Sequence, residues 1–167
     1  MHISFTNQTD KKVDTGMLER YGRKAAQLLS KRLATYCPPG ASVDDLGLEV
    51  FFVTDPMIRK LNKQHRGKDS PTDVISVSFV EDREFTPWML GSEAYPAGEI
   101  FLSVDMVARQ ARENDIPFMH EMSYMLVHGF LHVFGYDHED DAEEREMERA
   151  SLEVLGGVYP RRKEFGF

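Results

Sequence analysis

Three histidines in the C-terminal part of the chain have the type and spacing of a metal site. The stretch from His128 to His138 holds half of the six histidines in the chain. His128 and His132 are four residues apart, so on a helix their rings lie on one face, one turn apart. Gly135 can take the left-handed conformation that ends a helix. The chain can then fold back and bring His138 to the same ion.

Three protein ligands with one open position are typical of a catalytic zinc site, whereas structural sites usually have four ligands, often cysteines. Cys37 is the only cysteine of the chain, which excludes a cysteine-rich structural site. We therefore predict one divalent metal, zinc as the first choice, bound by His128, His132 and His138 and used for hydrolysis. Another divalent transition metal is an alternative, because imidazole ligands suit several ions.

A zinc protease is a second way to interpret this spacing. The pattern His-x-x-x-His-x-x-Gly-x-x-His is that of the metzincin proteases with one change. Those enzymes place a glutamate directly after the first histidine as the general base, and here that position is Gly129. Glu121 lies two turns upstream, roughly 10 Å along the helix axis, which is too far to serve the metal. A glycine at position 129 also lets substrate or a neighbouring element come close.

The elements that must position these histidines follow from hydrophobic periodicity. It predicts strands at residues 2–6, 46–54, 74–80 and 99–104. Helices are predicted at residues 15–36, 55–65, 105–114, 117–134 and 140–155, the second with Asp55 as its N-cap. Residues 81–97 are predicted to be an irregular surface excursion or lid. The order predicts an α/β or α+β fold, with a mixed sheet of about four strands packed with helices. The metal site lies on a central helix and the loop after it.

Length and composition limit the number of domains and indicate the cellular compartment. The chain has 167 residues and no repeat or linker, which predicts one domain over residues 1–167. The N-terminus lacks the basic start and apolar stretch of a secretory signal. No apolar run approaches the roughly 20 residues that span a bilayer. With a single cysteine no internal disulfide forms. We predict a cytoplasmic protein without membrane contact.

The charge of the chain is unevenly distributed. The net charge of -8 argues against loose binding to nucleic acid, which depends on neutralising phosphates. Residues 57–68, however, include five basic side chains and no acidic one, whereas residues 139–148 include seven acidic side chains and one basic one. A chain with a negative net charge can therefore still have a basic groove.

Three blocks of the sequence together resemble the YbeY family of bacterial metal-dependent endoribonucleases of ribosomal RNA maturation. The run from His128 to His138 matches the three-histidine motif of that family position for position. The second block consists of three short segments that lie close together: Leu61-Asn62, Arg66-Gly67-Lys68-Asp69 and Thr72-Asp73-Val74. The third block is Gly98-Glu99-Ile100, where the family usually has Gly-Asp-Ile. The blocks keep their order and cover residues 50–140. One departure is Val74-Ile75-Ser76-Val77-Ser78-Phe79, where the family tends to have Val-Leu-Ser-Phe-Pro.

The resemblance implies a single-strand-specific endoribonuclease that acts in 16S rRNA 3′-end maturation and in ribosome quality control. It implies zinc on the three histidines and catalytic roles for Arg66 and His128. The planar guanidinium of Arg66 suits a phosphate and the charge of its transition state. The nucleophile is either a zinc-bound water or the 2′-hydroxyl of the RNA, and no general base stands out.

Further expectations concern the RNA and its partners. Four basic residues are expected to follow the backbone of single-stranded or ribosomal RNA: Arg59, Lys60, Lys63 and Lys68. Thr72 and Asp73 are expected to be capping or turn residues. Partners implied by the resemblance are the ribosomal small subunit and assembly proteins. Two alternatives remain, a zinc metalloprotease-like hydrolase and a ribosome assembly factor whose metal is structural.

Overall fold

Four strands form one mixed sheet in the order β1-β2-β4-β3. The computed structural model describes residues 1–80, 94–138 and 140–156. The strands are β1 (His2–Asn7), β2 (Leu46–Val53), β3 (Val74–Ser78) and β4 (Tyr95–Ser103). β1, β2 and β4 are parallel, and β3 runs antiparallel to β4 at the edge. The predicted mixed sheet of about four strands is confirmed.

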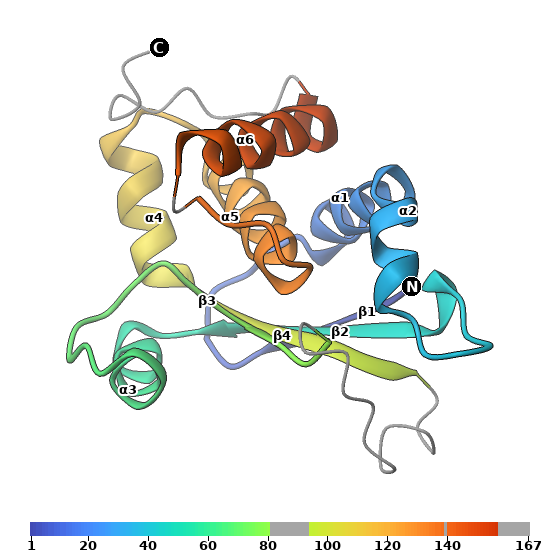
Figure 1. Ribbon diagram of the computed structural model, residues 1–167. Helices are drawn as coiled ribbons and strands as arrows, with labels where there is room; N and C mark the ends of the chain where they lie inside the picture. Colours follow the sequence, from blue (N-terminus) through green and yellow to red (C-terminus); the bar gives the residue numbers. More distant parts are fainter. Residues whose placement is uncertain (81–93, 139, 157–167) are drawn as a thin grey trace.

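Helices cover both faces of this sheet (Figure 1). One face carries α1 (Thr15–Leu28), α2 (Ser30–Leu33), α4 (Val104–Glu113), α5 (Phe118–Val133) and α6 (Asp141–Leu155), and the other carries α3 (Asp55–Arg66). Successive side chains of β2 point to opposite faces of the sheet. Leu48 and Val50 are buried on the face that carries five helices, whereas Glu49 between them points to the other face and is exposed. No helix within the described ranges combines the length and apolarity needed to cross a bilayer.

Helix α5 is the centre of the molecule. It lies between the sheet and α6 (Figure 1) and packs against β3, β4, α1, α4 and α6. Most of its residues are buried, among them Met122, Leu126 and Phe130. A helix that is apolar on nearly all sides belongs in the interior of a domain. The histidine cluster therefore rests on the most enclosed helix of the fold.

The helix predicted at residues 15–36 is interrupted in the structure. α1 ends at Leu28, the short α2 follows, and a 3-10 turn closes the segment at Ala34–Tyr36. Leu29 leaves helical geometry with φ -96° and ψ 12°. The apolar stripe continues past this point to Leu33, which is fully buried, so periodicity alone could not show the break.

Two predicted boundaries are also wrong, for reasons of tertiary structure. The N-cap of α3 is Thr54, whereas Asp55 is already helical and its carboxylate accepts the Ser103 hydroxyl at 2.6 Å and pairs with Arg109 at 2.7 Å. Strand β4 begins at Tyr95, four residues earlier than predicted, and its pairing with β2 passes through a register shift at which Ala97 of β4 is skipped. Residues 81–93 of the predicted irregular stretch lie outside the described residues.

Candidate metal centre

The structure brings His128, His132 and His138 together around one point. The Nε2 atoms of His128 and His132 are 3.1 Å apart, and one ligand nitrogen from each of the three histidines lies within 4.8 Å of the others. Nitrogens bound to zinc at about 2.0–2.1 Å lie within about 4 Å of one another, so these residues fit a metal after small side-chain adjustments. In the part of the chain that the structure describes, no other group of three histidine, cysteine or acidic side chains meets this spacing.

The environment of the cluster favours the neutral imidazole of His132. His128 and His132 are half-buried, and His138 is exposed. Burial lowers the pKa of His132, and the neighbouring His138 lowers it further. The ring of Tyr124 stacks on that of His128 at 6.0 Å between centroids. Because a metal binds the neutral imidazole, a lowered pKa keeps His132 ready as a ligand near neutral pH.

Gly135 ends α5 and delivers the third histidine. Its φ of +71° is left-handed. The N–H of Gly135 donates to the carbonyl of His132 at 3.1 Å, and the N–H of Tyr136 donates to that of Leu131 at 3.0 Å. These two bonds make a Schellman motif. The Asp137 carboxylate then accepts the backbone N–H of His138 at 2.8 Å, so Asp137 stabilises the turn itself.

Gly129, at the position of the protease glutamate, faces the sheet. A Cβ atom there would lie 2.9 Å from Cγ2 of Ile100 and 3.2 Å from Cγ2 of Val74. Glycine therefore allows α5 to approach β3 and β4 closely, the second of the two possibilities that the sequence raised. The position points into the core, where a glutamate would not fit.

We expect Gly129→Val to lower the free energy of unfolding by about 2–3 kcal/mol, because overpacking a filled core costs about 1–3 kcal/mol and valine gains little helix propensity. Urea denaturation measures the change. Ala142→Val is the control, since Ala142 is exposed on α6 and a valine there overpacks no core. A Gly129→Val protein as stable as the wild type would contradict the close contact of α5 with the sheet.

A cleft of about 540 Å³ opens beside the histidines. The turn after α5 supplies part of its lining, from Gly135 to His138. Strand β3 supplies another part through Val74, Ser76 and Ser78. Arg66, Lys68, Thr72 and Asp73 complete the lining. The cleft therefore combines the histidine cluster with two cationic side chains and several hydroxyls.

Arg66 reaches the cleft from the end of α3. It is the last residue of that helix, and Gly67 after it is left-handed with φ +69°. This C-cap turns the chain so that Arg66 and Lys68 both line the cleft. The positive charge of Arg66 also contributes to the lowered pKa of His132, after burial and the charge of His138. The guanidinium and the metal-binding cluster thus act within one electrostatic environment.

Thr72 and Asp73 stabilise the start of β3. The Asp73 carboxylate accepts the N–H of Val74 at 2.8 Å, the hydroxyl of Thr72 at 3.2 Å and the side-chain amide of Gln110 at 2.8 Å. These are the bonds of turn residues, as the sequence led us to expect. Both side chains nevertheless border the cleft.

Ser76 and Ser78 of β3 belong to the candidate site but were not predicted from the sequence. The Ser78 hydroxyl donates to the carbonyl of Val133 at 2.8 Å and joins β3 to the end of α5. Ser76 is half-buried on the same face of β3 and lines the cleft. The sequence did contain an indication of them. In a strand, Ser76 and Ser78 share one face while Ile75 and Val77 occupy the other.

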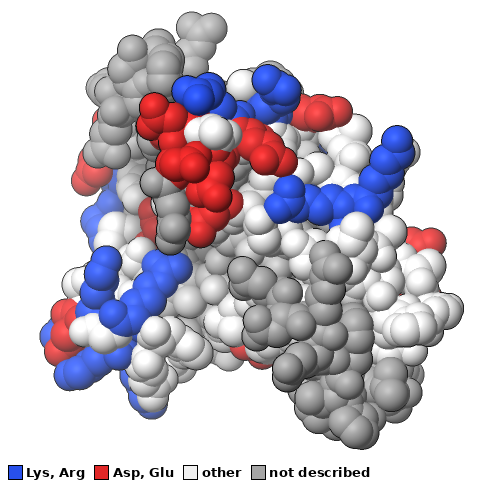
Figure 2. All heavy atoms as spheres, in the orientation of Figure 1, with Lys and Arg blue, Asp and Glu red and all other residues white. Residues whose placement is uncertain are grey.

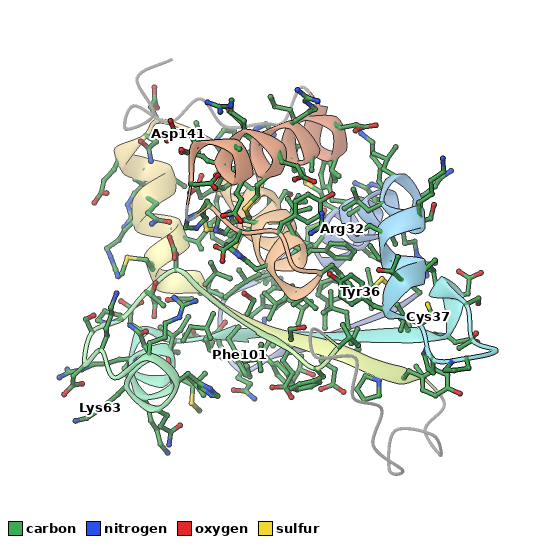
Figure 3. All side chains as sticks on the ribbon, viewed as in Figure 1. Arg32, Tyr36, Cys37, Lys63, Phe101 and Asp141 are labelled. Atoms are coloured by element: carbon green, nitrogen blue, oxygen red, sulfur yellow. The ribbon has the colours of Figure 1, made fainter. Side chains whose placement is uncertain are left out.

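Three of the four residues predicted to bind RNA lie outside the cleft. Arg59, Lys60 and Lys63 line a separate hollow of about 490 Å³, and only Lys68 borders the histidine cleft. Asp69 accepts from Arg59 at 2.8 Å and from Lys63 at 3.0 Å, which lowers the pKa of Asp69 to about 2. Figure 2 shows basic side chains gathered over α3 and acidic ones over α6, and Figure 3 shows Lys63 on the outer side of α3.

Comparisons with known proteins agree with this architecture. A protein from Geobacillus thermodenitrificans named Endoribonuclease YbeY is 38% identical over 155 residues, covering 92% of this chain and 91% of its own. The protein of the same name from Bacillus subtilis is 41% identical over 113 residues, covering 67% and 72%. The solution structure of TM1509 from Thermotoga maritima superposes with a TM-score of 0.56 at 25% identity, covering 92% and 89%.

The family profile extends this similarity over almost the whole chain. The profile described as Endoribonuclease YbeY matches residues 4–158. The match includes most of β1 and the helices that follow it, a part of the chain that the three sequence blocks do not cover. It also spans every residue that lines the histidine cleft. The chain belongs to the YbeY family of endoribonucleases.

Proposed function

We propose that this nuclease cuts single-stranded RNA with one zinc ion held by His128, His132 and His138. We further propose that it acts in the cytoplasm in 16S rRNA 3′-end maturation and in ribosome quality control, with the small subunit and assembly proteins as partners. One observation carries the proposal: Arg66 and Lys68 line the same cleft as the three histidines. Cations beside a metal-binding cluster suit a phosphodiester, whose charge rises in the transition state.

The side chains of the cleft divide the chemistry between them. A zinc ion held by the three histidines would supply positive charge and would lower the pKa of a coordinated water to about 7. Arg66 binds the scissile phosphate through its planar fork and stabilises the negative charge that develops on it. Lys68 neutralises a phosphate as a point charge. The half-buried His128 and His132 and the exposed His138 would hold the metal.

The size of the cleft supports an unpaired substrate. Its volume of about 540 Å³ lies within the roughly 300–1,000 Å³ of small-ligand sites, which suits a short segment of single strand. Sequence-specific RNA recognition mostly uses such unpaired segments. Arg59, Lys60 and Lys63 offer a second cationic surface on α3 for the continuing strand, weakened at two positions by the ion pairs to Asp69.

The two alternatives predict different chemistry. A protease needs a base where Gly129 packs against Ile100 and Val74, so the structure offers no support for it at this position. An assembly factor with a structural metal needs the metal for folding. Three ligands on the lining of an open cleft favour a catalytic metal over a structural one.

Removal of the metal tests the proposal directly. We expect a chelator to abolish cleavage of a single-stranded RNA while circular dichroism stays unchanged, and stoichiometric zinc to restore cleavage. A duplex of the same sequence serves as the control substrate and should remain uncut. Undiminished cleavage after chelation would refute the catalytic metal, and unfolding on chelation would favour a structural one. A cyclic 2′,3′-phosphate product would identify the 2′-hydroxyl as the nucleophile, whereas cleavage of a substrate with a 2′-deoxyribose at the scissile position would identify water.

A further inference from the structure

Arg32, on α2, contacts the turn between the second and third histidines. Its Nε donates to the carbonyl of Phe134 at 3.1 Å, and its Nη2 donates to that of Gly135 at 2.5 Å. The guanidinium carbon lies 3.8 Å from the centre of the Tyr136 ring. One side chain thus holds three consecutive residues of the segment that leads from α5 to His138.

Tyr36 reinforces the same turn. Its hydroxyl donates to the carbonyl of Phe134 at 3.1 Å, and its ring meets the Phe134 ring edge-on at 5.8 Å. A Cβ atom on Gly135 would lie 2.6 Å from the Tyr36 hydroxyl oxygen. Figure 3 shows Arg32 and Tyr36 projecting from the α2 region toward the end of α5. The segment around α2 therefore packs directly against the turn.

The contacts of Arg32 match what a helix end requires. The last carbonyls of an α-helix have no partner within the helix, and a cation near them interacts favourably with the helix dipole. The planar guanidinium offers several donors in a fixed geometry, so two carbonyls can be held at once. The ion pair with Glu146 at 3.2 Å is a peripheral contact, since the Glu146 side chain is 62% exposed.

We propose that Arg32 is a positioning residue for the metal centre, one that sets the place of His138 by holding the turn at Phe134, Gly135 and Tyr136. The inference rests on the proposed metal site. His128 and His132 are fixed by the buried helix α5, whereas His138 is exposed and follows the turn by two residues. Without Arg32 the third ligand must be ordered when the metal binds, and that ordering lowers the affinity.

Zinc affinity tests the inference without reference to RNA cleavage. The dissociation constant is measured by competition between the metal-free protein and a chromophoric chelator. We expect Arg32→Ala to weaken zinc binding by about 10- to 100-fold, the range for residues that orient metal ligands. Lys31→Ala is the matched control, because Lys31 is the adjacent cation of α2 and is exposed. Glu146→Ala removes only the peripheral ion pair, so both controls should bind zinc as the wild type does.

Each outcome decides between a positioning role and a purely structural one. A purely structural Arg32 would lower the melting temperature of the metal-free variant and leave its zinc affinity unchanged, which would overturn the inference. If Arg32→Ala fails to fold, Arg32→Lys decides, since lysine keeps the charge but loses the fork. If Arg32→Lys then bound zinc as tightly as the wild type does, the positioning role of Arg32 would be overturned. A wild-type protein that binds no zinc would refute the metal site itself, a result distinct from failure of the Arg32 inference.

Discussion

His132→Ala should purify without the metal and cut single-stranded RNA at least about 1,000-fold more slowly than the wild type, because a catalytic metal supplies several kcal/mol of transition-state stabilisation. His132 is the middle member of the cluster, with its Nε2 atom 3.1 Å from that of His128. Its loss leaves two ligands from different elements, which cannot hold an ion tightly. Metal analysis and single-turnover cleavage measure the two effects on the same preparation.

His120→Ala provides the matched control for this variant. His120 lies on the same helix, is half-buried like His132 and stands outside the cluster. We expect its metal content and cleavage rate to equal those of the wild type. Full metal content in His132→Ala would remove His132 from the ligand set, and a parallel loss in His120→Ala would show that the effect comes from damage to α5.

Arg66→Ala should keep the metal and lower the rate constant of cleavage by about 100- to 1,000-fold. This is the usual effect of removing one hydrogen-bond donor that stabilises the negative charge of a transition state. Arg66 lines the cleft but supplies no metal ligand. Arg66→Lys should recover part of the rate, because lysine restores the charge and not the bidentate geometry. Steady-state kinetics separate kcat from KM, and metal analysis confirms that the site remains filled.

Arg23→Ala is the control for Arg66, since Arg23 is exposed on α1 and pairs with Glu19 there. Its kinetics should match those of the wild type. Full cleavage by Arg66→Ala would exclude Arg66 as a phosphate clamp. A rise in KM with unchanged kcat would assign Arg66 to substrate binding and not to the transition state.

The placement of the histidines was predictable because it depends on local structure. One helical turn separates His128 from His132, and a glycine in the left-handed conformation ends that helix before His138. Both features follow from residue type and spacing within a single segment. The richness of residues 46–54 in valine, phenylalanine and leucine is equally local, and it correctly indicated strand β2.

The residues around the histidines were harder to predict because their partners are distant in the sequence. Arg32 contacts the carbonyls of Phe134 and Gly135, about a hundred positions along the chain. Asp55 has the residue type of an N-cap, yet its carboxylate binds Ser103 and Arg109. The ion pairs of Asp69 with Arg59 and Lys63 likewise depend on how the loop after α3 folds back. Local propensity carries no information on such contacts.

The two sides of the cleft come from segments that leave the ribosome at different times. Arg66, Lys68 and β3 are synthesised well before α5 and the turn that carries His138. A growing chain that has reached β3 therefore has Arg66 and Lys68 but none of the three histidines of the cluster. Because β3 must then pack against α5 to complete the cleft, a chain that ends at β3 lacks half of the candidate site. The candidate site is thus assembled only after α5 and the turn that follows it have been synthesised.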